Sequence, residues 1–313
     1  MPVKPMQYQE NTLNFSLPFS VQIPMTSPRL LFPHFRAINP NTSSFALSLR
    51  HSIFIFLAAT GIAIAAPDWK TTLTPPGIGT HPRLDPIALD YQMSWKGILN
   101  SGHLRMEFAP PGEKKPGAYV VRAHAVSQGA AAALHPYQFD CWSELHLASL
   151  LPRYVKSTEI DSNGKEITIA RYFENRVESE TSSVSKKTGK PEVKNRTFEQ
   201  GAVFDIFSSM LQIRSHPLAD GDHINLVIQS SDQPYLLRIH CVGREMHNGQ
   251  KAIKLSAGMN KIDRDTLELK PYKKLKRDAT LWLSDDHDRV PIELRAEIFL
   301  GDVRATLTQR KKL

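Results

Sequence analysis

The stretch that most constrains the fold is residues 279–307, which read ATLWLSDDHDRVPIELRAEIFLGDVRATL. Between positions 290 and 300, apolar residues alternate with charged ones, so that Glu293 and its charged neighbours occupy the face opposite the apolar side chains. A two-residue period indicates a half-buried β-strand. A second strand is expected at 280–284, and the aspartates between the two runs favour a turn. The end of the chain therefore predicts a β-hairpin, and it offers neither a nucleophile nor a ligand cage.

The same alternation recurs along most of the chain and predicts an antiparallel sheet. Ile87 and the apolar residues at every second position up to Trp95 form one strand face, and residues 119–127 form a further strand. Asn-Gly pairs at 163–164 and 248–249 lie between strand-like runs and predict hairpins. About a dozen strands without alternating helices require a sheet that curls or splits. The expected fold is mainly β: an antiparallel, strongly curved sheet or open half-barrel with one covering α-helix.

The single expected helix follows Asp205, which is a good N-cap. Apolar residues come after it at helical spacing, and Pro217 ends the segment. Two other stretches give less regular signals. Residues 138–154 allow a strand that runs into a helical turn or a strand with an irregular end. Residues 179–195 are polar and charged, so a mobile loop between long strands is expected there.

The N-terminal region predicts export. Residues 1–46 are rich in Pro, Asn, Ser and Thr, and are expected to be disordered or to be a leader upstream of the true start codon. Residues 47–66 have the parts of a signal peptide, since Arg50 precedes an uncharged apolar run that ends in small residues. A membrane-spanning helix needs about 20 apolar residues, and this run is shorter. Cleavage at position 65 or 66 is expected, with an uncleaved anchor as the alternative.

The remaining chain is expected to form one domain. Residues 67–86 hold several Pro and Gly residues and predict an extended linker, followed by a single antiparallel β domain at 87–309. The formal net charge is +8, of which residues 1–66 contribute only +3. Such a mild excess favours solubility more than a polyanionic partner, so no nucleic acid is expected. The mature protein is expected in the periplasm, without a stable membrane span.

Four segments of the chain together resemble one known family of exported bacterial proteins. They are YQMSWKGILNSGHLRM, then DIFSSMLQIR followed by PLADGD, then YLLRIHCVGRE, and finally WLSDDHDRVPIELRAEIFLGDVRATL. They resemble the domain of unknown function 3108 family, over roughly residues 89–307. The resemblance implies secretion to the periplasm and a mostly antiparallel β domain, similar to the curved half-barrel of bacterial lipoprotein carriers. It implies no activity, because none is assigned to the family as such.

Cys141 and Cys241 are the only cysteines in the sequence. In an oxidising compartment they could form a disulfide, which would remove roughly 4 kcal/mol of unfolded-state entropy in the loop model. The alternative is two separate buried thiols that behave as small apolar residues. The sequence leaves both open.

The chain lacks the common signatures of metal and catalytic sites. It has no HExxH motif and no Cys-His cluster with zinc spacing, and His240 and Cys241 are adjacent on a strand, so they face opposite ways. Asp285, Asp286 and Asp288 fit a turn better than a calcium loop. No G-x-S-x-G elbow and no P-loop is present. We therefore expect no cofactor and assign no catalytic residue.

Three functions fit these observations. The first is a non-enzymatic carrier whose curved sheet and helix enclose an apolar groove for a lipid-like or amphiphilic ligand. The second is an envelope scaffold whose concave face is filled by its own side chains and whose partner is another protein. The third and weaker alternative is a cell-envelope hydrolase with a site assembled from distant residues. A cavity favours the first, a packed interior the second, and titratable groups converging in a polar cleft the third.

Overall fold

The structure, a computed structural model, describes residues 68–77, 84–109, 118–298 and 301–313. The predicted leader and signal peptide lie outside these described residues. Residues 72–313 belong to one compact unit, which contains all the strands named below. Residues 68–71 belong to a second unit, where the 3-10 helix η1 (Trp69–Thr72) begins.

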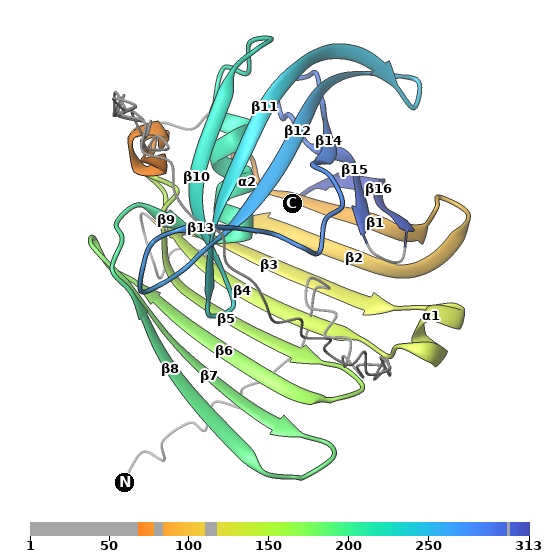
Figure 1. The fold of residues 1–313 in the computed structure, drawn as a ribbon. Helices are drawn as coiled ribbons and strands as arrows, with labels where there is room; N and C mark the ends of the chain where they lie inside the picture. The colour runs from red at the N-terminus through yellow and green to blue at the C-terminus, as the bar shows by residue number, and fades with distance from the viewer. Residues whose placement is uncertain (1–67, 78–83, 110–117, 299–300) are drawn as a thin grey trace, which may run out of the picture. The chain divides into compact units, whose positions relative to one another are not determined.

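The described chain contains sixteen strands and two α-helices (Figure 1). The first half of the sheet consists of β1 (Ile87–Trp95), β2 (Leu99–Ala109), β3 (Ala118–Ser127), β4 (Gln138–His146), β5 (Pro152–Ile160), β6 (Gly164–Tyr172), β7 (Val177–Ser185) and β8 (Pro191–Phe198). The second half consists of β9 (Val203–Phe204), β10 (His223–Ser230), β11 (Gln233–His247), β12 (Gln250–Ile262), β13 (Leu269–Pro271), β14 (Ala279–Ser284), β15 (Pro291–Ile298) and β16 (Gly301–Lys312). The helices are α1 (Gly129–Leu134) and α2 (Ile206–Ser215).

All the strands join one sheet in the order β8-β7-β6-β5-β4-β3-β2-β1-β16-β15-β14-β12-β11-β10-β9, with β13 paired to β12. Neighbours are antiparallel apart from the short pair of β9 with β10. The pairing of β1 with β16 joins the two halves of the chain. The sheet is strongly bent and does not close into a barrel (Figure 1). The predicted fold class, a mainly antiparallel curved sheet with a covering helix, is confirmed.

Helix α2 packs against the inner face of this bend. It begins where the sequence predicts, since the Asp205 carboxylate accepts hydrogen bonds from the amides of Phe207 and Ser208. It contacts β4 in one half of the sheet and β9 and β10 in the other. Two buried apolar clusters meet it: Phe207 belongs to a cluster with residues of β1–β4, and Ile213 to a cluster with residues of β10–β14. The inner face beside the helix is therefore occupied by the protein's own side chains.

Several local predictions are decided by the structure. Both Asn-Gly pairs lie at hairpins, and Asn248 and Gly249 both have positive φ, as a type I′ turn requires. Residues 138–154 form β4, a turn at 147–149 in which the amide of Leu150 donates to the His146 oxygen, and the start of β5. The mobile loop expected at 179–195 is wrong, because these residues belong to β7 and β8. The pairing of β7 with β6, and of β8 with β7, places these residues in the sheet without an apolar face of their own.

The closing stretch forms three strands rather than one hairpin, because β15 pairs with β14 on one side and with β16 on the other. Glu293 lies on the outer face as predicted but is only 3% exposed. Among the described residues, no helix combines the length and apolar character needed to cross a membrane.

Candidate functional site

The two cysteines are free and buried in different parts of the core. Cys141 on β4 belongs to the cluster beside β1–β4, and Cys241 on β11 belongs to the cluster beside β10–β14. Burial raises the pKa of the Cys141 thiol well above its ordinary value. Both thiols lie in buried positions, where a cysteine behaves as a small apolar residue.

The start of α2 brings together the most buried polar groups of the inner face. Asp205 Oδ2 accepts a hydrogen bond from Ser143 Oγ at 2.7 Å, across the contact between α2 and β4. Burial raises the pKa of Asp205, while the bonds from Ser143 and the helix amides oppose this shift. No histidine takes part in the contacts of this described cluster, and its hydrogen bonds satisfy the helix N-terminus. The group therefore acts as a helix cap.

The end of α2 is fixed by a buried arginine. Arg214 is 2% exposed, and its Nε and Nη2 donate to the backbone oxygen of Asp288 at 3.0 and 2.8 Å. Burial lowers the pKa of Arg214 to about 10. The Asp288 carboxylate pairs with Arg310 of β16. This network ties α2 to the β14–β15 turn and to the end of the chain.

Among the described residues, one group could hold a metal ion, and it combines two residues of this turn with Asp85, which precedes β1. Asp85, His287 and Asp288 each have a ligand atom within 4.8 Å of the others. Arg310 already neutralises the Asp288 carboxylate, and Asp85 and His287 are exposed. The aspartates thus serve the turn, with Asp286 Oδ1 accepting from backbone amides there.

A polar cluster surrounds Trp282 on the outer face of β14. His247 stacks on the indole with a centroid distance of 4.1 Å, and its Nε2 lies 2.9 Å from Glu293 Oε2. Asn248 Nδ2 donates to the same oxygen at 2.9 Å. Burial of Glu293 opposes its ionisation, but hydrogen bonds from Arg295, Asn248 and His247 outweigh this and lower its pKa. These groups satisfy one another, which explains why a glutamate can be buried on the outer face.

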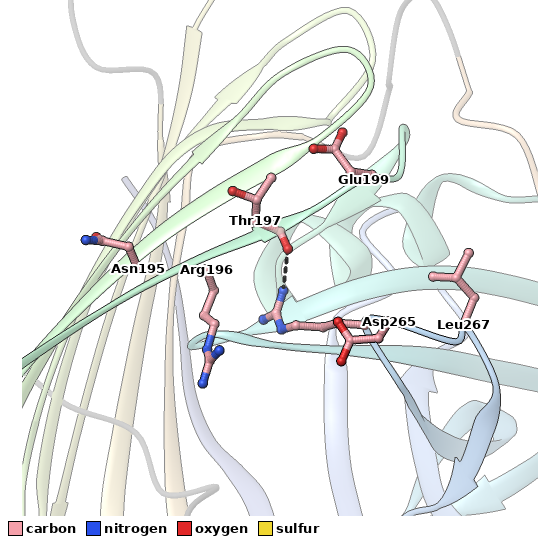
Figure 2. Close-up of a pocket in the computed structure, with 7 residues that line it drawn as sticks. Asn195, Arg196, Thr197, Glu199, Asp265 and Leu267 are labelled. Carbon is pink, nitrogen blue, oxygen red and sulfur yellow. Dashed lines mark hydrogen bonds between the residues drawn. The ribbon is translucent and has the colours of Figure 1, made fainter.

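A surface hollow of about 490 Å³ lies where β8 faces the connection between β12 and β13 (Figure 2). One side is formed by residues 195–197 and Glu199, and the other by Arg264, Asp265 and Leu267. Arg264 Nη1 donates to the backbone oxygen of Thr197 at 3.4 Å, the contact that is dashed in Figure 2. The hollow is polar and open, and it lies along the free side of β8.

β8 is the edge strand at one end of the sheet. Among the described strands, it pairs with β7 on one side and with no strand on the other. Every residue from Pro191 to Thr197 is exposed. An edge strand carries unpaired N–H and C=O groups along its open side and can therefore pair with another chain. The charges of Lys194 and Arg196 and the proline at its start are features that limit unspecific pairing.

The direction of each backbone group in β8 follows from two observations. The Thr197 oxygen accepts from Arg264, so it faces away from β7. In an antiparallel pair, the N–H and C=O of a residue point to the same side, and the side alternates along the strand. Val193 and Asn195 therefore also present their backbone groups outward. Pro191, which has no N–H, falls at an outward position as well, where the ladder with β7 loses nothing.

Sequence reasoning missed this edge because it treated residues 179–195 as a loop. The polar residues of β7 and β8 give no apolar period, since neither face of these strands is fully covered. A faint signal was present, because small or β-branched residues occupy every second position from Val177 to Ser183, with Ser179 and Thr181 between them. Without an apolar face, that spacing alone does not distinguish a strand from a loop.

A family model described as "Protein of unknown function (DUF3108)" matches residues 90–308. The chain belongs to this family. The predicted resemblance to domain of unknown function 3108 is thus confirmed, and the match covers the sheet except for the start of β1 and the end of β16. No curated protein matches the DUF3108 chain. Among solved structures, it is similar to a crystal structure of a β-barrel-like protein of domain of unknown function DUF1849 from Brucella abortus. That similarity has a TM-score of 0.46 at 9% identity, and covers 74% of this chain and 99% of the other.

Proposed function

We propose that this DUF3108 protein is an exported, non-enzymatic interaction protein of the cell envelope, and that β8 receives an extended segment of a partner protein as an added strand. The observation that carries the proposal is the open edge of β8, with outward backbone groups at Val193 and Asn195 beside a polar hollow. Main-chain hydrogen bonds supply affinity in this mode of recognition. Export is proposed from the sequence of residues 47–66.

The inner face supports a scaffold more than a carrier. Drug-sized ligands occupy clefts of about 300–1,000 Å³ that are mostly apolar. The inner face beside α2 carries the two apolar clusters, with Leu211 and Leu218 fully buried. An apolar hollow of about 280 Å³ lies beside Phe204, below that range. The titratable groups with shifted pKa values near α2 take part in its cap and in the turn below it, which gives no support to the hydrolase alternative.

The proposal is tested with a library of displayed random peptides selected on the full chain. Asn195→Pro removes one outward N–H while leaving the ladder to β7 intact, and Asn195→Thr changes the side chain but keeps that N–H. Selected peptides are expected to bind the wild type and Asn195→Thr, and to lose about tenfold or more in affinity for Asn195→Pro. Equal binding to both variants, or a selection that yields no binder, would refute strand addition at β8.

Two further measurements test the remaining parts of the proposal. Native mass spectrometry of the protein purified from the periplasm is expected to give a ligand-free mass. A co-purified amphiphile would favour the carrier instead. N-terminal sequencing of the exported form is expected to begin at residue 66 or 67, and an intact Met1 would contradict cleavage.

A further inference from the structure

The turn between β1 and β2 exposes large apolar side chains. Trp95 is 43% exposed, Ile98 87% and Leu99 45%. Lys96 and Gly97 between them both have positive φ, at 53° and 69°, which is the geometry of a two-residue type I′ turn. The amide of Ile98 donates to the backbone oxygen of Trp95 at 3.1 Å and closes this turn, so the exposed apolar side chains lie together at the tip of the hairpin.

Helix α1 lies next to this tip and adds to its apolar surface. The amide of Gln128, just before α1, donates to the backbone oxygen of Ser101 on β2 at 2.9 Å. The helix is GAAAAL, it has no buried residue, and Leu134 at its end is 74% exposed. Residues 94–104 and 128–137 contain no Asp or Glu. We call the tip together with α1 the apolar tip.

The charges around the apolar tip are positive or neutralised. Lys96 Nζ lies 5.8 Å from the centre of the Trp95 ring. Arg304 lies against Gly97, where an added Cβ would come 2.7 Å from its Nη1. The Asp302 carboxylate on β16 is paired with Arg304 at 2.7 Å. Among the described residues, Lys96 therefore remains as the charge of the turn that no carboxylate neutralises.

The indole of Trp95 lies close to the start of β16. Its Nε1 lies against the backbone of Gly301, where a Cβ would approach to 2.9 Å. Gly301 has a φ of +117°, which side-chain-bearing residues rarely adopt. An indole has an apolar body and a polar N–H, which suits the boundary between lipid tails and headgroups.

We propose that the apolar tip docks on an anionic membrane surface. Trp95, Ile98 and Leu99 enter the outer part of the bilayer, and Lys96 contacts the phosphate groups. The surface is a protruding turn rather than a groove, so it inserts into a soft layer instead of enclosing a partner's side chain. Its charge is complementary to acidic lipid, and a nearby Lys or Arg strengthens binding to such a surface. This docking is independent of strand addition at β8, because five strands separate β8 from β2 in the sheet.

Residues 47–66 of the full chain could bind a bilayer by themselves, so binding of the protein to vesicles does not test the apolar tip. The experiment therefore measures whether single side-chain positions enter the bilayer. An environment-sensitive nitrobenzoxadiazole dye is attached to Ile98→Cys, and separately to Met246→Cys as the control. Met246 is 65% exposed and lies on β11, far along the sheet from β1. The native cysteines are buried and are not expected to react in the folded protein. Vesicles of phosphatidylglycerol or phosphatidylcholine are added, with and without doxyl-labelled lipid.

The dye at position 98 is expected to brighten several-fold with phosphatidylglycerol vesicles and to be quenched by doxyl lipid, with a smaller response to phosphatidylcholine. The dye at 246 is expected to stay unchanged. Either of two results would overturn the proposal: the dye at 98 responds no more than the dye at 246, or it brightens with protein concentration in the absence of lipid. The second result would identify the tip as a contact between two copies of the chain.

Discussion

Replacing Asp140 with asparagine is expected to stabilise the protein, and increasingly so as the pH rises. Asp140 lies on β4 opposite His124 of β3, and both of its carboxylate oxygens are buried. Burial raises the pKa of Asp140 from 3.8 to about 7, although a hydrogen bond with Gln138 opposes the shift. The folded protein thus holds a proton on this carboxyl that the unfolded chain releases near pH 4.

The magnitude follows from the two pKa values of the same group. A difference of one pH unit between them is worth 1.36 kcal/mol, so the ionised carboxylate of Asp140 destabilises the fold by about 4 kcal/mol above pH 7. Below about pH 4 the carboxyl is protonated in both states and the effect disappears. A raised folded-state pKa of an acid therefore lowers stability as the pH rises through this window. Asparagine cannot ionise and avoids the loss.

The assay is urea unfolding of the wild type and Asp140→Asn at several pH values between 4 and 8.5. The difference between the two free energies of unfolding cancels the contributions of all other titrating groups. It is expected to grow by about 4 kcal/mol in favour of the variant across this range. Asp265→Asn, at an exposed position, controls for the loss of a carboxylate. A difference that stays constant with pH would refute the reasoning.

Three other substitutions or modifications probe the remaining networks. Asp205→Ala is expected to cost about 1–3 kcal/mol of stability in urea unfolding, because two helix amides and Ser143 lose their acceptor, whereas Asp205→Asn keeps most of it; equal losses in both would contradict the capping role. Glu293→Gln is expected to cost about 1–3 kcal/mol at pH 7. The loss should fade in acid. The pKa of Glu293 is lower in the folded protein than in the unfolded chain, so its carboxylate stabilises the fold above the unfolded-state pKa and no longer does so below the folded-state pKa. A loss of stability that persists at low pH would contradict this role of the ionised carboxylate. In the absence of reductant, a thiol reagent is expected to react with Cys141 and Cys241 in the unfolded protein but not in the folded one. If the unfolded protein also shows no reactive thiol, the two cysteines form a disulfide.

The sequence predicts those elements whose signal is local. Asp205 and Pro217 delimit α2 because a side-chain cap and a missing amide act within a few residues. The Asn-Gly pair at 248–249 predicts its turn for the same reason, since it tolerates positive φ. The curved antiparallel sheet follows from the repeated two-residue period.

The sequence does not predict features that depend on distant neighbours. Glu293 has the pattern of a solvent-facing residue, and its burial depends on contacts with His247 and Asn248 from the β11–β12 hairpin, which no local pattern near Glu293 contains. Helix α1 is one and a half turns of small residues, too short to show a helical period. The edge of β8 depends on the strand order of the sheet, which no local pattern contains.

The most direct test of the account is residue-resolved amide hydrogen exchange of β8. In the free protein, the amides of Lys194 and Arg196 are expected to be protected by pairing with β7, while those of Val193 and Asn195 exchange rapidly. Binding of a selected peptide is expected to protect Val193 and Asn195 as well. Uniform exchange along β8, or a bound peptide that leaves Asn195 unprotected, would contradict an open strand edge as the site where the partner binds.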